Sequence, residues 1–550
     1  MQGSLARSHG ATALGPLHEG LARLTGWRAA GMAALLGAFS ALAFAPFHFT
    51  AALAVSLTGL VWMIDGARGA RRWGRSVFAR GWAFGFGFFL VSLYWTASPF
   101  LVEPERTALL IWMPLILLPG GMALIWGAAM AMAGAFWSAS PSRVFMFTVF
   151  FALGEMIRGH LFGGFPWNLA GTSWVPGGPM SQAAALGGVY WLTLVTVFIC
   201  AAPAALVDTR ETRGLAGRIL PLLLAVLAAA GLWSWGAQRL MQPTELTARE
   251  LVLMDAGVPQ NQKFRVPKDQ VLRRYAELLV NTDTGGDDLV IWPEGALPVT
   301  MLQDDQSMDV ISAYLGNRTL IAGTARYISS GLNLQVYYNS LAVLNRDSNR
   351  SGALGLYDKH RLVPMGELPL SRILPFGEQI SSVLPSALQR LATSGFEPGE
   401  GPAIVYGERM PPFVAMICYE ALYPSVPRTA QRLAGHRADW LVTISNDAWF
   451  GEGLGPAQHY AQNRYRAIET GLPMARVASR GTSAVIDGFG RELARGRPVT
   501  GGPDDWTAKV AKSALPAPVA LPVYQTRAGA LFFWVTLAAM VVLAFFAWRR

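Results

Sequence analysis

The sequence predicts a polytopic α-helical membrane domain of about eight spans, joined to a domain of the α/β class. Hydrophobic residues make up 52% and charged residues 15% of the 550 residues, whereas an ordinary globular protein is about 25% charged. The apolar residues form long runs in the first half and at the C-terminus, and from about residue 250 they form short strands between polar helices. The arginines behind the net charge of +10 cluster beside the apolar runs. This placement is typical of membrane topology signals, so we expect a membrane-embedded chain with no nucleic-acid partner.

Eight runs have the length and composition of membrane spans, which need about 20 mostly apolar residues. Seven lie in the first half of the chain, near residues 29–46, 50–65, 81–98, 108–135, 143–157, 181–207 and 217–236, and the eighth covers residues 528–548. Residues 1–28 carry no apolar core with basic and cleavage-site flanks, so we interpret them as a cytoplasmic tail rather than a signal peptide. This division leaves residues 237–527 as one domain between spans seven and eight.

The orientation follows from the basic loops. The loop after the second span, 65–75, is rich in arginine, as are the loop at 210–218 and the C-terminal end, whereas the loop at 101–106 is acidic on balance. Counting seven crossings from a cytoplasmic N-terminus places every basic loop inside and residues 237–527 outside. The prediction depends on all seven crossings, because one fewer would move the domain to the cytoplasm.

Within the membrane part, Glu155 and Arg158 stand three residues apart, so on a helix they share a face and can pair. A Gly/Pro-broken aromatic segment, 163–168, follows them at the expected outer interface. The pair and segment fit either a structural ion pair with a Trp anchor or a lipid-facing loop over an active site.

The outer domain shows apolar strands that alternate with helices. We expect strands at 251–255, 289–292, 320–323, 340–344, 413–417, 441–445 and 484–487, and helices at 271–280 and 464–470. Near-continuous apolar strands between helices indicate buried sheets covered by helices, which is the α/β class.

Three of these strand segments end in a residue that can do chemistry. Cys418 ends the run Pro412–Ile417, Glu294 follows Ile291-Trp292-Pro293, and Lys359 follows Leu356-Tyr357-Asp358. Cys418 can act as a nucleophile if Glu294 accepts its proton as general base. Lys359 can stabilise the oxyanion of a tetrahedral intermediate and lower the pKa of the thiol, which Glu294 alone would raise. The three residue types therefore favour covalent acyl chemistry.

Each of these residues also has a simpler interpretation. A lone strand Cys is more often a core residue, Glu294 alone fits a surface strand end, and Lys359 alone fits an exposed turn. A dyad of Cys418 with His360 is disfavoured, because neighbouring strand residues point to opposite faces. The second cysteine, Cys200, lies in an apolar run, so we expect no disulfide. The seven histidines show no ligand spacing, so we expect no metal site and no cofactor, and we interpret His459 as a loop residue or one that supports the site from behind.

The segments around these residues resemble the carbon–nitrogen hydrolase superfamily of nitrilase type, which uses a Glu-Lys-Cys triad on an α-β-β-α sandwich. The resemblance rests on Trp292-Pro293-Glu294, on Tyr357–Glu367, on Ile417–Glu420, on Asn446–Phe450, on Arg464–Glu469, and on Arg476 with Gly481-Thr482-Ser483. Together with the spans, and with the segments Ala43–Phe47, Tyr94-Trp95, Glu155–Arg158 and Gly164–Trp167, the chain is similar to the apolipoprotein N-acyltransferase family over nearly its whole length after residue 28.

The resemblance implies a two-step acyl transfer in a bacterial inner membrane, with the outer domain on the periplasmic side. Cys418 would take an acyl chain from a phospholipid as a thioester, and the amine of a diacylglyceryl-cysteine apolipoprotein would then accept it. It also implies supporting roles for Glu367, Tyr419 and Glu420, with the two carboxylates orienting Lys359 and the nearby loops.

The chain departs from the family pattern at Phe264, where Trp is usual, and we expect Phe264 and Trp292 to belong to a substrate loop. Two other function classes stay open: a membrane-tethered amidase or nitrilase that acts on a small amide, and a transporter or scaffold with a ligand-binding domain. The membrane part holds few ionisable residues besides Glu155 and Arg158, which argues against a proton-coupled transporter.

Overall fold

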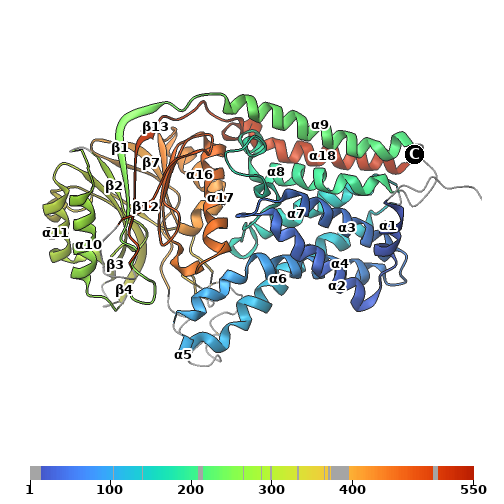
Figure 1. Cartoon of the computed structure of the whole chain (residues 1–550), viewed down its shortest axis with the longest axis horizontal. Helices are drawn as coiled ribbons and strands as arrows, with labels where there is room; N and C mark the ends of the chain where they lie inside the picture. The colour runs from blue at the N-terminus through green and yellow to red at the C-terminus, as the bar shows by residue number, and fades with distance from the viewer. Residues whose placement is uncertain are drawn as a thin grey trace, which may run out of the picture.

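The computed structural model describes residues 14–102, 104–138, 140–207, 215–263, 265–285, 288–297, 300–330, 334–364, 366–369, 372, 379, 395–499 and 506–549. A bundle of long helices occupies one end of the molecule and two β-sheets occupy the other (Figure 1).

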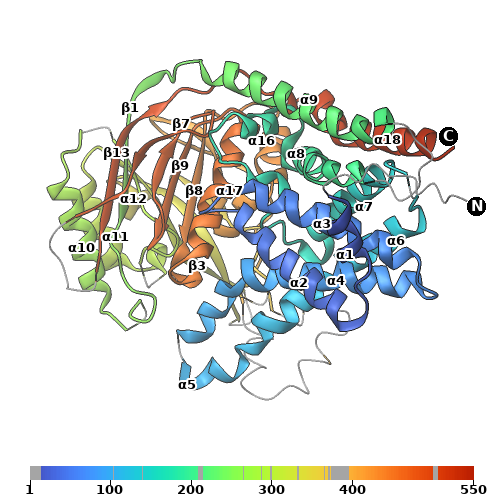
Figure 2. The same ribbon diagram turned by 45° about the vertical axis from the view of Figure 1, so that its right-hand side comes forward.

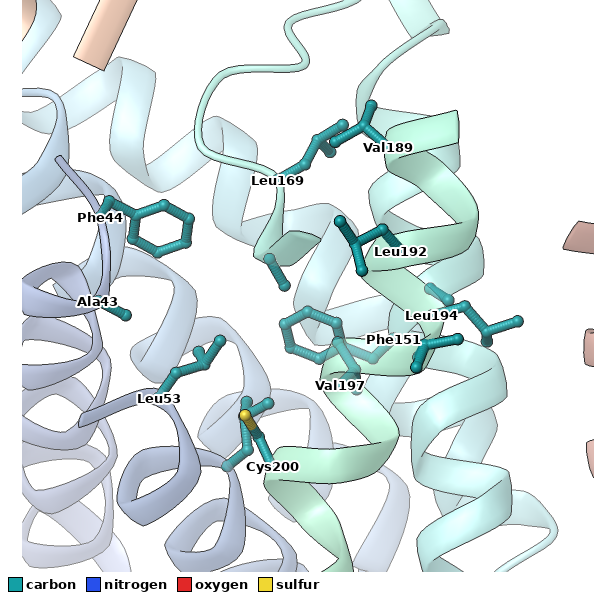
Figure 3. Packing of buried hydrophobic residues seen from close by; sticks show 14 of the residues in the cluster. Ala43, Phe44, Leu53, Phe151, Leu169, Val189, Leu192, Leu194, Val197 and Cys200 are labelled. Atoms are coloured by element: carbon teal, nitrogen blue, oxygen red, sulfur yellow. The ribbon is translucent and has the colours of Figure 1, made fainter. Parts of the chain in front are cut away.

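The bundle contains the long apolar helices of the first half of the chain and the C-terminal helix. They are α1 (Gly15–Ala22), α2 (Gly26–Ser40), α3 (Thr50–Arg68), α4 (Trp73–Ser92), α6 (Leu118–Ala135), α7 (Arg143–Arg158), α8 (Ala184–Ala201), α9 (Leu215–Leu240) and α18 (Arg527–Arg549), with the short α5 (Pro104–Thr107) at one edge. Helix α8 lies at the centre of the bundle. The hydrophobic core around this helix contains Cys200, near Leu53 and Val197 (Figure 3). Few residues of helices α9 and α18 are buried, which is what a helix that faces lipid requires.

The expected count of eight spans is matched only in part. Five helical segments are long and apolar enough to cross a membrane, and α4 with the bent turn Tyr94–Leu101 makes a sixth, among the residues described. The expected spans at 29–46 and 143–157 correspond to α2 and α7, which have 15 and 16 residues. Helix α2 passes into a tight turn at Ala41–Ala43, and α7 ends at the charged Arg158. Part of the expected tail is also ordered, because α1 packs against α3 and His18 Nε2 lies 3.2 Å from Asp65 Oδ2.

The second part of the chain forms two sheets. The first has seven strands in the order β12-β13-β1-β2-β3-β4-β5, and the second has six in the order β11-β10-β9-β8-β7-β6. The first sheet contains β1 (Leu246–Asp255), β2 (Leu289–Ile291), β3 (Thr319–Ser330), β4 (Leu334–Leu344), β5 (Gly355–Asp358), β12 (Arg497–Pro498) and β13 (Lys509–Pro516). The second contains β6 (Ile404–Gly407), β7 (Met410–Ile417), β8 (Trp440–Asn446), β9 (Met474–Ser479), β10 (Ala484–Ile486) and β11 (Glu492–Arg495).

Helices cover the outer faces of both sheets, so the α/β class is confirmed (Figures 1 and 2). Helices α10 (Lys268–Asn281) and α11 (Asp305–Leu315) cover the first sheet, α16 (Ser425–Ala434) and α17 (Leu454–Thr470) cover the second, and the short α12 (Ser348–Ser351) joins α11. Strand β7 shows the alternation that two covered faces require, since Phe413 and Ala415 face the other sheet while Val414 and Met416 face the helices.

The bundle and the second sheet share one hydrophobic core. The cluster that fills the bundle continues through α17, with Ala467 and Ile468, to Val414 and Met416 of β7. Helix α17 contacts α8 on its other side. The chain enters the sheets from the end of α9 and returns into the bundle through α18 (Figure 1).

Candidate active site

Each of the three residues that the sequence singles out follows a strand. Glu294 lies three residues after β2, Lys359 follows β5 directly, and Cys418 follows β7 directly. Strands β2 and β5 belong to the first sheet and β7 to the second, so the carboxylate and the ammonium approach the thiol from the facing sheet. All three side chains are buried, so their charges act in a medium that screens them weakly.

Glu294 and Lys359 are in direct contact. Lys359 Nζ lies 3.3 Å from Glu294 Oε1 and 2.8 Å from Glu367 Oε2. Asn339 Nδ2 donates to both carboxylates, at 2.6 Å to Glu294 Oε1 and 2.8 Å to Glu367 Oε1. The backbone N–H of Asn446, at the end of β8, donates to Glu294 Oε2 at 2.8 Å. Both oxygens of Glu294 are therefore held, one from each sheet, which fixes the carboxylate as a general base would require.

Cys418 joins β7 to the short helix Cys418–Leu422 with a backbone φ of +51°. A residue with a Cβ rarely adopts this left-handed conformation, which costs about 1–3 kcal/mol and marks functional sites. The Cys418 carbonyl oxygen lies 3.2 Å from His459 Nε2, and the other ring nitrogen of His459 lies 3.0 Å from Asp447 Oδ1. Arg476 Nη2 donates to Asp447 Oδ2 at 2.8 Å. A buried network on the second sheet thus holds the strained backbone of Cys418 in place.

The electrostatics of the cluster favour a neutral thiol at rest. Burial raises the pKa of Cys418, the charge of Glu294 raises it further, and Lys359 opposes both. Burial by itself would lower the pKa of Lys359, but the carboxylates of Glu294 and Glu367 outweigh burial, so that the pKa of Lys359 is raised. The ammonium is therefore permanent, and a thiolate forms only when its proton has an acceptor.

Glu420 joins the loops that carry the nucleophile and the lysine. It is fully buried and accepts the backbone N–H groups of Ile417 at 2.8 Å and His360 at 2.9 Å, and the Tyr357 hydroxyl at 2.9 Å. Burial alone would raise the pKa of Glu420, but hydrogen bonds from His360 and the backbone lower it overall. Its carboxylate therefore ties the end of β7 to the turn after β5.

The segment 163–167 of the bundle contacts the candidate site. The hydroxyl of Tyr419, next to the nucleophile, donates to the Gly164 carbonyl at 2.6 Å. Arg158 Nη1 donates to the carbonyls of Phe165 at 2.6 Å and Trp167 at 2.8 Å, while its Nε donates to Glu155 Oε1 at 2.7 Å. The expected pairing of Glu155 with Arg158 is confirmed, and the pair anchors a loop that contacts the active site.

Sequence reasoning missed two residues of the cluster, Asn339 and Lys263. Asn339 stands just before the apolar run 340–344, and a polar residue there was its only signal. Lys263 Nζ lies 3.3 Å from the Glu294 carbonyl oxygen. Burial lowers the pKa of Lys263 to about 8, against the charges of Glu294 and Asp255, which raise it.

Several expectations are corrected or left aside by the structure. Trp292 follows β2 directly, and its side chain is buried in the core, where the ring stacks on Tyr275 of α10 with centroids 4.1 Å apart. Phe264 lies outside the described residues. His459 lies on helix α17 and not in a loop, and its contact with the Cys418 carbonyl fits the other interpretation, that it supports the site from behind. His360, which the sequence disfavours as a dyad partner of Cys418, has its Nδ1 at 2.5 Å from Glu420 Oε1.

Comparison of the sequence with known proteins identifies the family of this chain. Residues 36–202 match the model of the apolipoprotein N-acyltransferase N-terminal domain, and residues 256–502 match that of the carbon–nitrogen hydrolases. An apolipoprotein N-acyltransferase of Rhodopseudomonas palustris is 34% identical over 544 residues, covering 96% of this chain and 97% of the relative. One of Caulobacter vibrioides is 35% identical and covers 84% of this chain and 86% of the relative.

The chain belongs to the apolipoprotein N-acyltransferase family. It is accordingly an acyltransferase built on the carbon–nitrogen hydrolase fold, so the transporter or scaffold interpretation is dropped. Among solved structures, an amidase from Nesterenkonia sp. matches 52% of this chain and 96% of its own length, with 15% identity and a TM-score of 0.30.

Proposed function

We propose that the chain moves an acyl chain from a membrane phospholipid to the N-terminal amine of a diacylglyceryl-cysteine apolipoprotein, through a thioester on Cys418. The contact of Glu294 with Lys359, beside the strained end of β7, carries the proposal. The chain acts in lipoprotein maturation as a member of its family, and the donor, the acceptor and the residue roles are what we add.

In the first half-reaction, Glu294 takes the proton of Cys418 and the sulfur attacks the ester carbonyl of the phospholipid. The tetrahedral intermediate carries an oxyanion, which the ammonium of Lys359 stabilises. When the carbon–oxygen bond of the ester breaks, Glu294 returns the proton to the departing alkoxide. The lysophospholipid leaves and the thioester remains.

In the second half-reaction, the lipoprotein amine attacks the thioester carbonyl and Glu294 accepts a proton from the nitrogen. The carbon–sulfur bond breaks, and the proton passes to the sulfur of Cys418, which restores the resting thiol. Because the same carboxylate transfers protons in both halves, its position matters to each. Glu367 and Asn339 hold Lys359 and Glu294 in place, and Glu420 holds the two loops.

The site borders the bundle, which supports lipid substrates. Tyr419 and Tyr423 both donate to the Gly164 carbonyl, at 2.6 and 2.7 Å. The neighbouring Leu161 and Phe162 expose 46% and 65% of their surface, and apolar side chains so exposed fit contact with lipid. A phospholipid can thus reach the sulfur from the bilayer while its head group stays at the interface.

We further propose the topology of a tail at 1–28, a seven-span domain at 29–236, a catalytic domain at 237–527 and a closing helix at 528–548. Helices α4 and α9 begin at the end of the bundle away from the sheets (Figure 1), and Arg72, Arg75 and Arg218 belong to these helix starts by their positions in the sequence. By the positive-inside rule, this supports a catalytic domain on the periplasmic side of a bacterial inner membrane.

The test uses the full-length protein in vesicles with a phospholipid that carries a labelled acyl chain. The wild type should acquire hydroxylamine-sensitive label and pass it to a diacylated lipopeptide, and Cys418→Ala should fall to background. Cys200→Ala is the matched control, because this second thiol is buried in the bundle (Figure 3), and it should keep the wild-type signal. Label on Cys418→Ala protein would refute the proposal. Release of free fatty acid in place of labelled lipopeptide would favour the amidase-type alternative, with water as the acceptor.

A further inference from the structure

A basic cavity of about 290 Å³ opens between the start of α2 and the start of α4. Its polar wall contains Arg72, Arg75, Ser76 and Arg80, and the rest is lined by Gly26, Ala29, Ala30, Ala70 and Ala79. None of its lining residues is acidic. The cavity therefore combines a cationic rim with an apolar wall.

The cavity lies far from the active site. The other end of α4 leads to Trp95, whose indole N–H donates to Gln458 of α17 at 3.3 Å, so that end touches the catalytic domain. Helix α4 has 20 residues, which span about 30 Å. The cavity and the active site are thus separated by roughly the thickness of the hydrocarbon layer.

Its arginines have unused hydrogen-bonding capacity. Arg72 and Arg75 are exposed, and neither pairs with an acidic residue in the part of the chain that the structure describes. Arg80 is 5% exposed; its Nη2 donates to the Leu24 carbonyl at 2.7 Å, while its Nε has no acceptor among the described residues. Asp65, a buried acid of α3, is already held by Arg143 at 3.0 Å.

Two further features favour the binding of an anionic head group at this point. Arg72 caps α4 without a side-chain hydrogen bond, so the first-turn N–H groups and the positive end of the helix dipole stay available. Trp27, which is 80% exposed, and Trp73, which packs under Arg68 at 4.0 Å, lie at the same end of the bundle. Tryptophans of this kind mark the level of the lipid head groups.

We propose that this cavity binds the phosphate of an anionic phospholipid from the leaflet opposite the catalytic domain. Arg72 and Arg75 hold the phosphate, with Ser76 and Arg80 beneath them. The start of an acyl chain lies along Ala29 and Ala79. This lipid is not the acyl donor, since its ester groups lie a bilayer away from Cys418. Basic pockets between membrane helices bind anionic head groups in this way.

The test measures lipid binding by the full-length protein in detergent, by native mass spectrometry. Ether-linked phosphatidylglycerol is the probe, because it has no ester to donate, and ether-linked phosphatidylcholine is its zwitterionic counterpart. The wild type should prefer phosphatidylglycerol. The double variant Arg72→Ala/Arg75→Ala should bind it roughly 30-fold more weakly, as expected from the loss of two arginine–phosphate contacts. Unfolding temperatures without lipid check that the variants fold.

Two controls separate this site from general attraction to a basic surface. Arg71→Ala removes a charge from the same loop, outside the cavity lining, and should leave the affinity within about twofold. Ala79→Phe fills the apolar wall without changing any charge and should weaken lipid binding. An equal loss in Arg71→Ala, or no preference between the two lipids, would overturn the proposal. Displacement of the lipid by millimolar inorganic phosphate would overturn it in favour of a site for free phosphate.

Discussion

The position of Glu294 depends on Asn339, and this dependence gives a sharp test of the mechanism. The Asn339 amide donates to Glu294 and Glu367, and each bond is made to an ionised group. Such bonds contribute about 1.5–3 kcal/mol each. Asn339→Leu removes both, but Lys359 and the Asn446 N–H still contact Glu294. We therefore expect a loss of about 2–3 kcal/mol of transition-state stabilisation, which is about 30- to 150-fold in kcat/KM.

Asn339→Asp should be worse than Asn339→Leu, because it adds a third carboxylate beside two that share one lysine. A like charge at about 4 Å costs about 4 kcal/mol at an effective dielectric constant of 20, which is about 10³-fold in rate. Activity of this variant should recover as the pH falls, since the protonated Asp can again donate a hydrogen bond. Asn339→Leu should show no such recovery.

The assay follows the two half-reactions separately: formation of labelled thioester from phospholipid in a single turnover, and transfer from that thioester to a diacylated lipopeptide. Since Glu294 serves both, both rates should fall by similar factors. Asn345→Leu, in the turn after β4, is the matched control and should keep both rates. If only one half-reaction slows, or if Asn339→Asp matches the wild type, then Asn339 does not position the general base.

Three further perturbations test the surroundings of the site. Burial lowers the pKa of Lys263 to about 8 from 10.5, so the unfolded chain binds more protons between these values and stability should rise with pH across them, by up to about 3 kcal/mol. The unfolding temperature of Lys263→Met should not show this rise with pH. If the unfolding temperatures of the variant and the wild type rose with pH by the same amount, the prediction would be wrong. The pKa of Glu420 is lowered from 4.5, so its carboxylate stabilises the fold at neutral pH, and this contribution is lost as the pH falls below about 4.5. Acid unfolding of Glu420→Gln should therefore be less steep than that of the wild type. Arg158→Met leaves Glu155 buried without its partner and should cost about 3–5 kcal/mol, seen as a lower unfolding temperature that Glu155→Gln in the same chain partly restores.

Much of the architecture follows from local pattern. The runs Phe413–Ile417 of β7 and Trp440–Val442 of β8 are apolar and buried, because both faces of the second sheet are covered. The polar residue after each strand then marks the sheet edge, and this is why Glu294, Lys359 and Cys418 could be named before any coordinates. What pattern cannot supply is which strands face each other across the two sheets. The Asn446 N–H of β8 reaches Glu294 only because the second sheet faces the first at this point.

The end of helix α2 was harder to predict for a physical reason. Hydropathy counts apolar residues but does not register where a turn begins, so the span expected at 29–46 ends as a helix at Ser40. Hydropathy also does not show which polar residues lie at the interface between the bundle and the sheets. Residues such as Gln458 and Gln462 look like surface positions of a polar helix, yet they accept hydrogen bonds from Trp167 and the Asn168 backbone of the bundle.

Helix α17 explains why the bundle is part of the active site and not only its anchor. One side of this helix packs on the second sheet, where His459 contacts the Cys418 carbonyl. The other side packs on α8 and on the loop that Arg158 holds, where Tyr465 donates to the Trp174 carbonyl at 2.7 Å. Almost the whole helix is buried between the two. Because protein interiors are closely packed, a shift of the bundle would move α17 and with it the backbone of the nucleophile. The arrangement therefore couples the geometry of the thiol to the membrane helices.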